Sequence, residues 1–208
     1  EKHSAELRRV QQDRKEEKTN AQKEVFAKNP QKLAPGPTGI SPSSKPEEII
    51  TIVSGLPRTG TSVMMQMLAA GGLEPLSDGN RHADESNPKG YYEFDKAIQL
   101  ASDSSWVGDA KGKVVKIVAQ LLSKLPDFID GKIARYRIVF MDRDLNEVVA
   151  SQHTMLSKQG KKGADLEINK LIETYESQLD TVQHMLAERR IPWVRIKHAD
   201  VISNPQQV

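Results

Sequence analysis

Short apolar runs alternate with longer amphipathic stretches along most of the chain. The apolar runs have the length of buried strands and lie near residues 49–54, 114–118, 136–141 and 193–197. The amphipathic stretches have helical periodicity and lie near residues 61–71, 144–158 and 165–189. Strands that alternate with helices in this way predict an α/β fold, in which a mainly parallel sheet is covered on both faces.

The first 47 residues have a different pattern. Residues 1–29 interleave Lys and Arg with Asp and Glu and contain few apolar positions, which predicts a charged helical arm rather than a core element. Residues 30–47 are rich in Pro, Ser and Gly, which is typical of an extended linker. We therefore expect one globular domain over residues 48–208. We expect the arm to be either a solvated helix or a segment that docks a protein partner, and to connect to a preceding domain.

Composition narrows the function classes. The net charge of +2 gives no indication of a nucleic-acid partner, and the absence of Cys excludes disulfides, thiolate catalysis and Cys-based zinc sites. No apolar run reaches the roughly 20 residues that span a bilayer, so we expect a cytoplasmic protein without a membrane span. The chain begins with Glu and ends within the strand and helix pattern, so we expect that part of the domain follows residue 208.

The loop between the first predicted strand and the first predicted helix has the spacing of a phosphate-binding loop. It runs from Gly55 to Gly60 and continues into Thr61 and Ser62. Such loops bind anions because glycine lets successive N–H groups converge at a helix N-terminus. Nucleotide-hydrolysing loops carry Lys before the last Ser or Thr, whereas this chain has Thr61 there and its loop cation is Arg58. The alternative is an ordinary turn with a solvated Arg58.

A second pattern follows the predicted strand at 136–141. Arg143 lies at the entrance of the next predicted helix, and Ser151 lies eight residues later. Residues eight apart on a helix are separated by roughly 80° around its axis, so they share a face and can reach one ligand. The alternative is an amphipathic helix with Asp144 as its N-cap and Arg143 in a surface ion pair.

These two patterns together resemble the nucleotide-binding motifs of the sulfotransferases. The loop Pro57–Ser62 resembles their 5′-phosphosulfate loop, and the pair Arg143 and Ser151 resembles their 3′-phosphate site. The segment Asn87–Glu93 resembles an Asn-Pro-x-Gly-Tyr-Tyr/Phe-Glu segment of bacterial sulfotransferase-like domains. The resemblance covers residues 48–208. It implies a P-loop NTPase-like three-layer sandwich that transfers a sulfuryl group from 3′-phosphoadenosine 5′-phosphosulfate (PAPS) to a hydroxyl or amine.

The resemblance also implies how PAPS is bound. The residues implied for its two phosphate ends are Arg58, Thr59, Gly60, Thr61 and Ser62 at the phosphosulfate, with Arg143 and Ser151 at the 3′-phosphate. PAPS has no γ-phosphate, so it needs neither a lysine aimed at β/γ-phosphates nor a bridging metal, and no metal is expected.

Three residues are implied for catalysis. Arg58 would stabilise the leaving phosphate, and Lys116 matches a lysine of the family's cytosolic branch, although Val118 stands where that branch has its catalytic histidine. The polar segment 78–93 follows the loop at a distance that brings it back over the sulfate, and Glu85 is our preferred general base there. The rival bases are His82, Asp84 and Glu93.

Two other function classes stay open. One is a non-catalytic module of sulfotransferase fold that binds nucleotide or serves assembly. The other is a P-loop phosphotransferase, which Thr61 disfavours because the usual Lys is missing.

Overall fold

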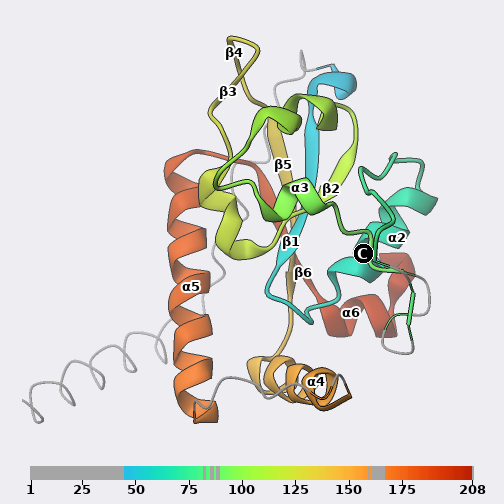
Figure 1. Ribbon diagram of the computed structural model, residues 1–208, viewed down its shortest axis with the longest axis vertical. Helices are drawn as coiled ribbons and strands as arrows, with labels where there is room; N and C mark the ends of the chain where they lie inside the picture. The colour runs from blue at the N-terminus through green and yellow to red at the C-terminus, as the bar shows by residue number, and fades with distance from the viewer. Residues whose placement is uncertain are drawn as a thin grey trace, which may run out of the picture. The chain divides into compact units, whose positions relative to one another are not determined.

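A parallel four-stranded sheet forms the centre of the domain. The computed structural model describes residues 45–81, 83, 84, 87, 90–158, 160 and 167–207. The strands are β1 (Ile50–Gly55), β2 (Val114–Lys116), β5 (Tyr136–Asp142) and β6 (Trp193–Lys197). Their order in the sheet is β2-β1-β5-β6, and every pairing between neighbours is parallel (Figure 1). This confirms the α/β fold and the parallel sheet predicted from the alternating pattern.

The register of the sheet brings the carboxyl ends of its strands to one edge. Val53 of β1 lies opposite Lys116 at the end of β2, and Gly55 lies opposite Met141 near the end of β5. Ligands of open α/β sheets bind outside this edge. The connections that carry Arg58 and Arg143 both leave the sheet here.

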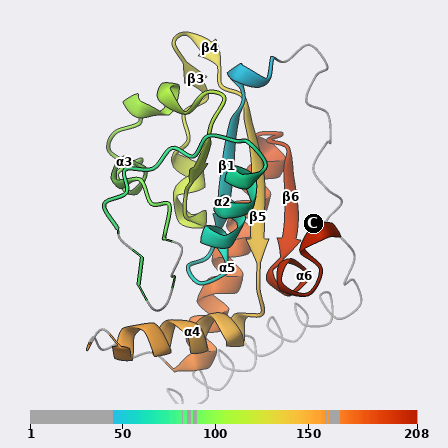
Figure 2. The ribbon, with the colours of Figure 1, turned by 90° about the vertical axis from the view of Figure 1, so that its right-hand side faces the viewer.

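Helices cover both faces of the sheet. The longer ones are α2 (Thr61–Ala70), α4 (Leu145–Lys158) and α5 (Ile168–Glu188), and the short ones are α3 (Asp95–Ile98) and α6 (His198–Ser203). The two views show α2 and α5 on opposite sides of the strands (Figures 1 and 2). The resulting arrangement has three layers, with the sheet in the middle.

Two apolar clusters follow from this arrangement. Ile50 and Ile52 of β1 belong to a cluster that includes Leu186 of α5, whereas Val53 belongs to a cluster with Met65 of α2. All six residues of β1 are buried. A strand buried on both faces needs an almost continuous apolar sequence, which is why this run was recognisable.

The ends of the helices have local causes. Asp144 caps α4, because its Oδ1 accepts hydrogen bonds from the N–H groups of Asn146 at 3.0 Å and Glu147 at 3.2 Å. Gly60 precedes α2 with φ of 91°, and Gly71 follows it. The predicted helix at 165–189 begins at Ile168 in the structure, and residues 161–166 lie outside the described part.

Several short elements were not predicted. They are the 3₁₀ turns η1 (Pro46–Glu48), η2 (Ser105–Ala110), η3 (Ala119–Lys124) and η4 (Pro205–Gln207), and the hairpin β3 (Phe128–Ile129) and β4 (Lys132–Ile133). Elements this short have no hydrophobic period that a sequence window can detect. No helix in the described residues is long and apolar enough to cross a membrane. The predicted arm at 1–29 lies outside the described residues, as does the linker up to residue 44.

Candidate functional site

At two positions of the loop between β1 and α2, the backbone has a conformation that only glycine adopts without strain. Gly55 has φ of 149° and Gly60 has φ of 91°. A Cβ on Gly55 would lie 2.6 Å from Thr59 Oγ1 and 2.7 Å from the Met141 carbonyl oxygen. Arg58 also has a positive φ, at 73°. Non-glycine residues in this region cost about 1–3 kcal/mol and cluster at functional sites.

Thr59 holds the turn of this loop. Both its hydroxyl and its N–H donate to the Leu56 carbonyl, at 2.7 Å and 3.3 Å. Thr59 is buried, so its contribution to a ligand site is the shape of the loop. The amides at the start of α2 have no partner within the helix, and Gly60, Thr61 and Ser62 line the adjoining cavity.

A cavity of about 390 Å³ lies at the carboxyl edge of the sheet. It is bordered by the loop after β1, the end of β2 and residues from the segment 81–93. Arg143, which precedes α4, and Met155 of α4 also line it. Four positively charged side chains line it, namely Arg58, Arg81, Lys116 and Arg143. Among the described lining residues the only carboxylate is that of Glu93. The excess of positive charge suits an anionic ligand.

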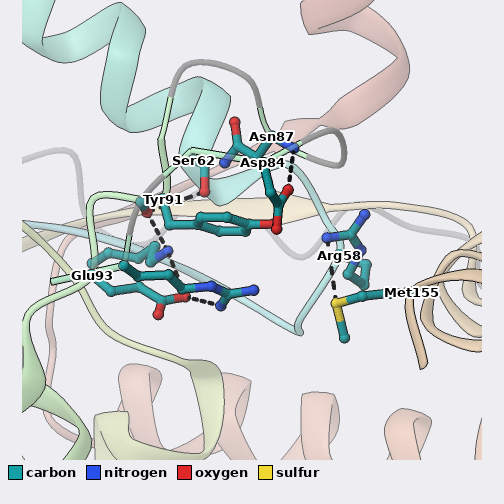
Figure 3. Close-up of polar contacts among 9 residues, drawn as sticks. Arg58, Ser62, Asp84, Asn87, Tyr91, Glu93 and Met155 are labelled. Carbon is teal, nitrogen blue, oxygen red and sulfur yellow. Dashed lines mark hydrogen bonds and ion pairs between the residues drawn. The ribbon is translucent and has the colours of Figure 1, made fainter. Parts of the chain in front are cut away.

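Arg58 links the loop to α4. Its Nε donates to Ser151 Oγ at 3.0 Å. Its Nη1 lies 3.8 Å from the Met155 sulfur (Figure 3). Arg143 donates from Nη1 to the Arg58 carbonyl at 3.1 Å. The structure therefore brings Arg58, Arg143 and Ser151 into one contact network, although they are up to 93 residues apart in sequence.

Arg143 also makes the ion pair that was weighed as the alternative. Its Nε lies 2.9 Å from Glu147 Oε2, and its side chain is 23% exposed. A pair one helical turn apart is common on helix surfaces. Here the same guanidinium also lines the cavity. Arg143 thus lines the cavity, where it could contact a ligand, although Asp144 caps α4 and Arg143 is paired with Glu147.

The polar segment after α2 returns over the loop at Tyr91, as expected for residues 78–93. The Tyr91 carbonyl accepts hydrogen bonds from Ser62 Oγ at 3.2 Å and from Lys116 Nζ at 2.5 Å (Figure 3). Its hydroxyl lies 2.8 Å from both carboxylate oxygens of Asp84, and the Arg81 guanidinium lies 3.5 Å from its ring centroid. Residue 91 therefore fastens the segment to the phosphate loop and to β2.

Glu93 joins the two cations on this side of the cavity. Its Oε1 lies 2.6 Å from Arg81 Nη1 and 3.4 Å from Lys116 Nζ. Burial lowers the pKa of Lys116 from its usual value, while the Glu93 carboxylate opposes that shift. An ammonium with a lowered pKa releases its proton more readily, which suits a group that donates to a leaving oxygen.

The predicted general base, Glu85, and its rival His82 lie outside the described residues. The other two rivals are placed. Asp84 accepts from the Tyr91 hydroxyl, whereas Glu93 lines the cavity. Val118 also lines the cavity.

Three of the residues that line the cavity were not predicted from the sequence to contact a ligand: Arg81, Met155 and His198. His198 directly follows β6, so the rule that ligands bind beyond the carboxyl ends of parallel strands points to it. Met155 lies four residues beyond Ser151, on the same face of α4, which helical spacing predicts. Arg81 lies in a polar loop without a regular pattern.

Within the described residues, no group of three or more His, Asp or Glu side chains could hold a metal ion. No protein-family model matches the chain, and no curated protein sequence matches it.

Proposed function

We propose that this protein is a PAPS-dependent sulfotransferase. The observation that carries the proposal is the phosphate-type loop whose cation, Arg58, lines a cavity. Among the described residues, four positive side chains and one carboxylate line this cavity. A nucleoside triphosphate would call for Lys at position 61 and carboxylates for Mg²⁺. A metal-free anion such as PAPS needs cations near its two phosphate ends instead.

The proposed transfer forms one bond and breaks one bond. The acceptor oxygen or nitrogen attacks the sulfur of PAPS, and the bond from sulfur to the 5′-phosphate oxygen breaks. The bonding electrons leave with 3′-phosphoadenosine 5′-phosphate, and the acceptor proton passes to a base. We assign the leaving oxygen to Arg58 with help from Lys116, because preorganised cations stabilise charge that develops there. We assign the proton to Glu85.

The 3′-phosphate is assigned to Arg143 and Ser151. In the described structure Arg143 uses Nε for Glu147 and Nη1 for the Arg58 carbonyl, so Nη2 is left to donate to a phosphate. Ser151 accepts from Arg58, and its own hydroxyl proton can be donated to the same phosphate. Binding of the 3′-phosphate beside Ser151 would then also orient the Arg58 side chain.

Calorimetric titration with 3′-phosphoadenosine 5′-phosphate tests the nucleotide site. We expect Arg143→Ala to weaken binding about ten- to a hundredfold, because a hydrogen bond to a charged group contributes roughly 1.5–3 kcal/mol. Adenosine 5′-monophosphate lacks the 3′-phosphate, so the wild-type protein should bind it more weakly than 3′-phosphoadenosine 5′-phosphate by a similar factor. Arg189→Ala is the control, because Arg189 pairs with Asp127 and does not line the cavity. Equal affinity for the two nucleotides would contradict the assignment.

Transfer itself is tested with sulfur-labelled PAPS and acceptors that carry sugar, phenol, peptide and amine groups. A labelled acceptor supports the enzyme, and Glu85→Gln should then reduce turnover by about 10²–10⁴-fold. Tight nucleotide binding without transfer to any acceptor class would favour the non-catalytic module. Hydrolysis of ATP with magnesium would favour the phosphotransferase.

A further inference from the structure

His198 lies against the phosphate loop. It is the first residue of α6. Val201 of α6 belongs to the same apolar cluster as Met64 and Met65 of α2. A Cβ added to Gly60 would lie 2.6 Å from His198 Cδ2 and 3.4 Å from Nε2. The ring therefore rests on the residue that precedes α2, and it lines the same cavity as Arg58 and Arg143.

The surroundings of this ring favour its uncharged form. Burial lowers the pKa of His198 below its usual value, the positive charge of Arg143 lowers it further, and Glu147 opposes both. Among the described residues no hydrogen bond engages either ring nitrogen. The adjoining residues, Gly60 and the first two of α2, carry no charge. The nearest charges along the chain are those of Lys197 and Asp200.

We propose that His198 takes up a proton when an anion binds in the cavity and then acts as an additional cation of the anion site. This inference rests on the anion site of the proposed function, although it does not depend on which group is transferred. An opposite charge within about 4–6 Å favours the charged form of a titratable group. A bound phosphate or sulfate beside Gly60 would supply that charge, and the open ring nitrogen would receive the proton.

The direction of the pH dependence follows from linkage. Because the anion raises the pKa of His198, the bound protein holds more protons than the free protein between the two pKa values. Affinity is therefore highest below the pKa of the free protein and falls as the pH rises through the interval to the pKa of the complex. Each unit of difference between them changes the affinity by about tenfold.

Proton NMR of the histidine ring measures this directly. Inorganic sulfate is the probe, because it stays a dianion between about pH 5 and pH 8, where histidine titrates. Ionic strength is matched with chloride, and His198→Gln identifies the resonance. We expect sulfate to raise the pKa of His198 by about one unit or more. His184 is the internal control, because it is exposed on α5 and its Nδ1 is paired with the Asp180 carbonyl oxygen.

The same titration with 3′-phosphoadenosine 5′-phosphate separates this inference from the proposed function. A raised pKa with sulfate supports the inference even if the nucleotide does not bind, in which case the proposed function fails alone. A nucleotide that binds while the pKa of His198 stays unchanged overturns the inference and leaves the proposed function standing. If saturating sulfate leaves the pKa of His198 unchanged, that result by itself overturns the inference. Calorimetry on His198→Gln adds a second test, because sulfate affinity should then lose its dependence on pH.

Discussion

At the scale of single residues, the site depends on backbone conformations that few side chains adopt. Gly55 and Gly60 have positive φ values and have neighbours that leave no room for a Cβ. Arg58 has a positive φ between them, and its side chain is fixed by Ser151 on α4. Arg58 also lines the cavity at the carboxyl edge of the sheet, so a strained backbone position and a cavity-lining cation coincide at this residue.

Arg58→Ala is predicted to reduce sulfuryl transfer about 10²–10³-fold, the usual loss when one preorganised electrostatic group is removed. Nucleotide affinity should fall by a smaller factor, because the charge that Arg58 meets is largest in the transition state. Turnover and calorimetric titration measure the two effects separately. Arg58→Lys keeps the charge but lacks the planar donor group, so its turnover should lie between those of the wild-type protein and Arg58→Ala. Equal losses in turnover and in affinity would show that Arg58 only binds the nucleotide.

Gly60→Ala is predicted to destabilise the protein more than Gly72→Ala. Both glycines have φ above 90°, so both variants carry the same kind of backbone strain. A Cβ at Gly72 meets nothing within 4 Å, whereas one at Gly60 approaches His198 Cδ2 to 2.6 Å. The strain alone costs about 1–3 kcal/mol, and the close contact adds to it at Gly60. Urea unfolding of both variants measures the difference, and equal losses would contradict the contact with His198.

At the scale of elements, the connection between α2 and β2 is fastened at one carbonyl oxygen. Ser62 at the start of α2 and Lys116 at the end of β2 both donate to the Tyr91 carbonyl. The segment that carries Asp84 and Glu93 is therefore held over the loop by two elements of the fold. The Glu93 carboxylate of this segment lines the cavity.

Ser62→Ala is predicted to loosen this segment. Loss of one hydrogen bond costs about 0.5–1.5 kcal/mol, so amide exchange near Tyr91 should accelerate by roughly two- to tenfold. Ser102→Ala is the matched control, because the Ser102 hydroxyl donates to the Gln99 carbonyl in an exposed turn away from the loop. Hydrogen exchange read by mass spectrometry compares the peptides that cover residues 90–93. Unchanged exchange there in Ser62→Ala would show that Lys116 alone holds the segment.

At the scale of the whole domain, the sheet gathers groups that the sequence spreads over about 140 residues. Arg58, Lys116, Arg143 and His198 follow or end four strands, and the parallel arrangement places all four at one edge. The positive charge of the cavity does not come from one sequence motif. Each strand contributes one basic group at the same end of the sheet. The topology therefore makes this positively charged cavity a property of the fold.

The sequence determined the elements that have a clear period. The four strands and the three long helices were predicted within a few residues, because β1 and β5 are buried apolar runs and α2, α4 and α5 have amphipathic periodicity. Arg58, Lys116 and Arg143 were also found as cavity residues, since each follows or ends a recognisable strand.

Only the tertiary structure decided the contacts between distant segments. The hydrogen bond from Arg58 to Ser151, the double contact at the Tyr91 carbonyl and the position of His198 on Gly60 each join residues far apart in the chain. Local periodicity carries no information on which side chains far apart in sequence are in contact. Those contacts follow from the order and register of the strands, because the sheet fixes which loops become neighbours.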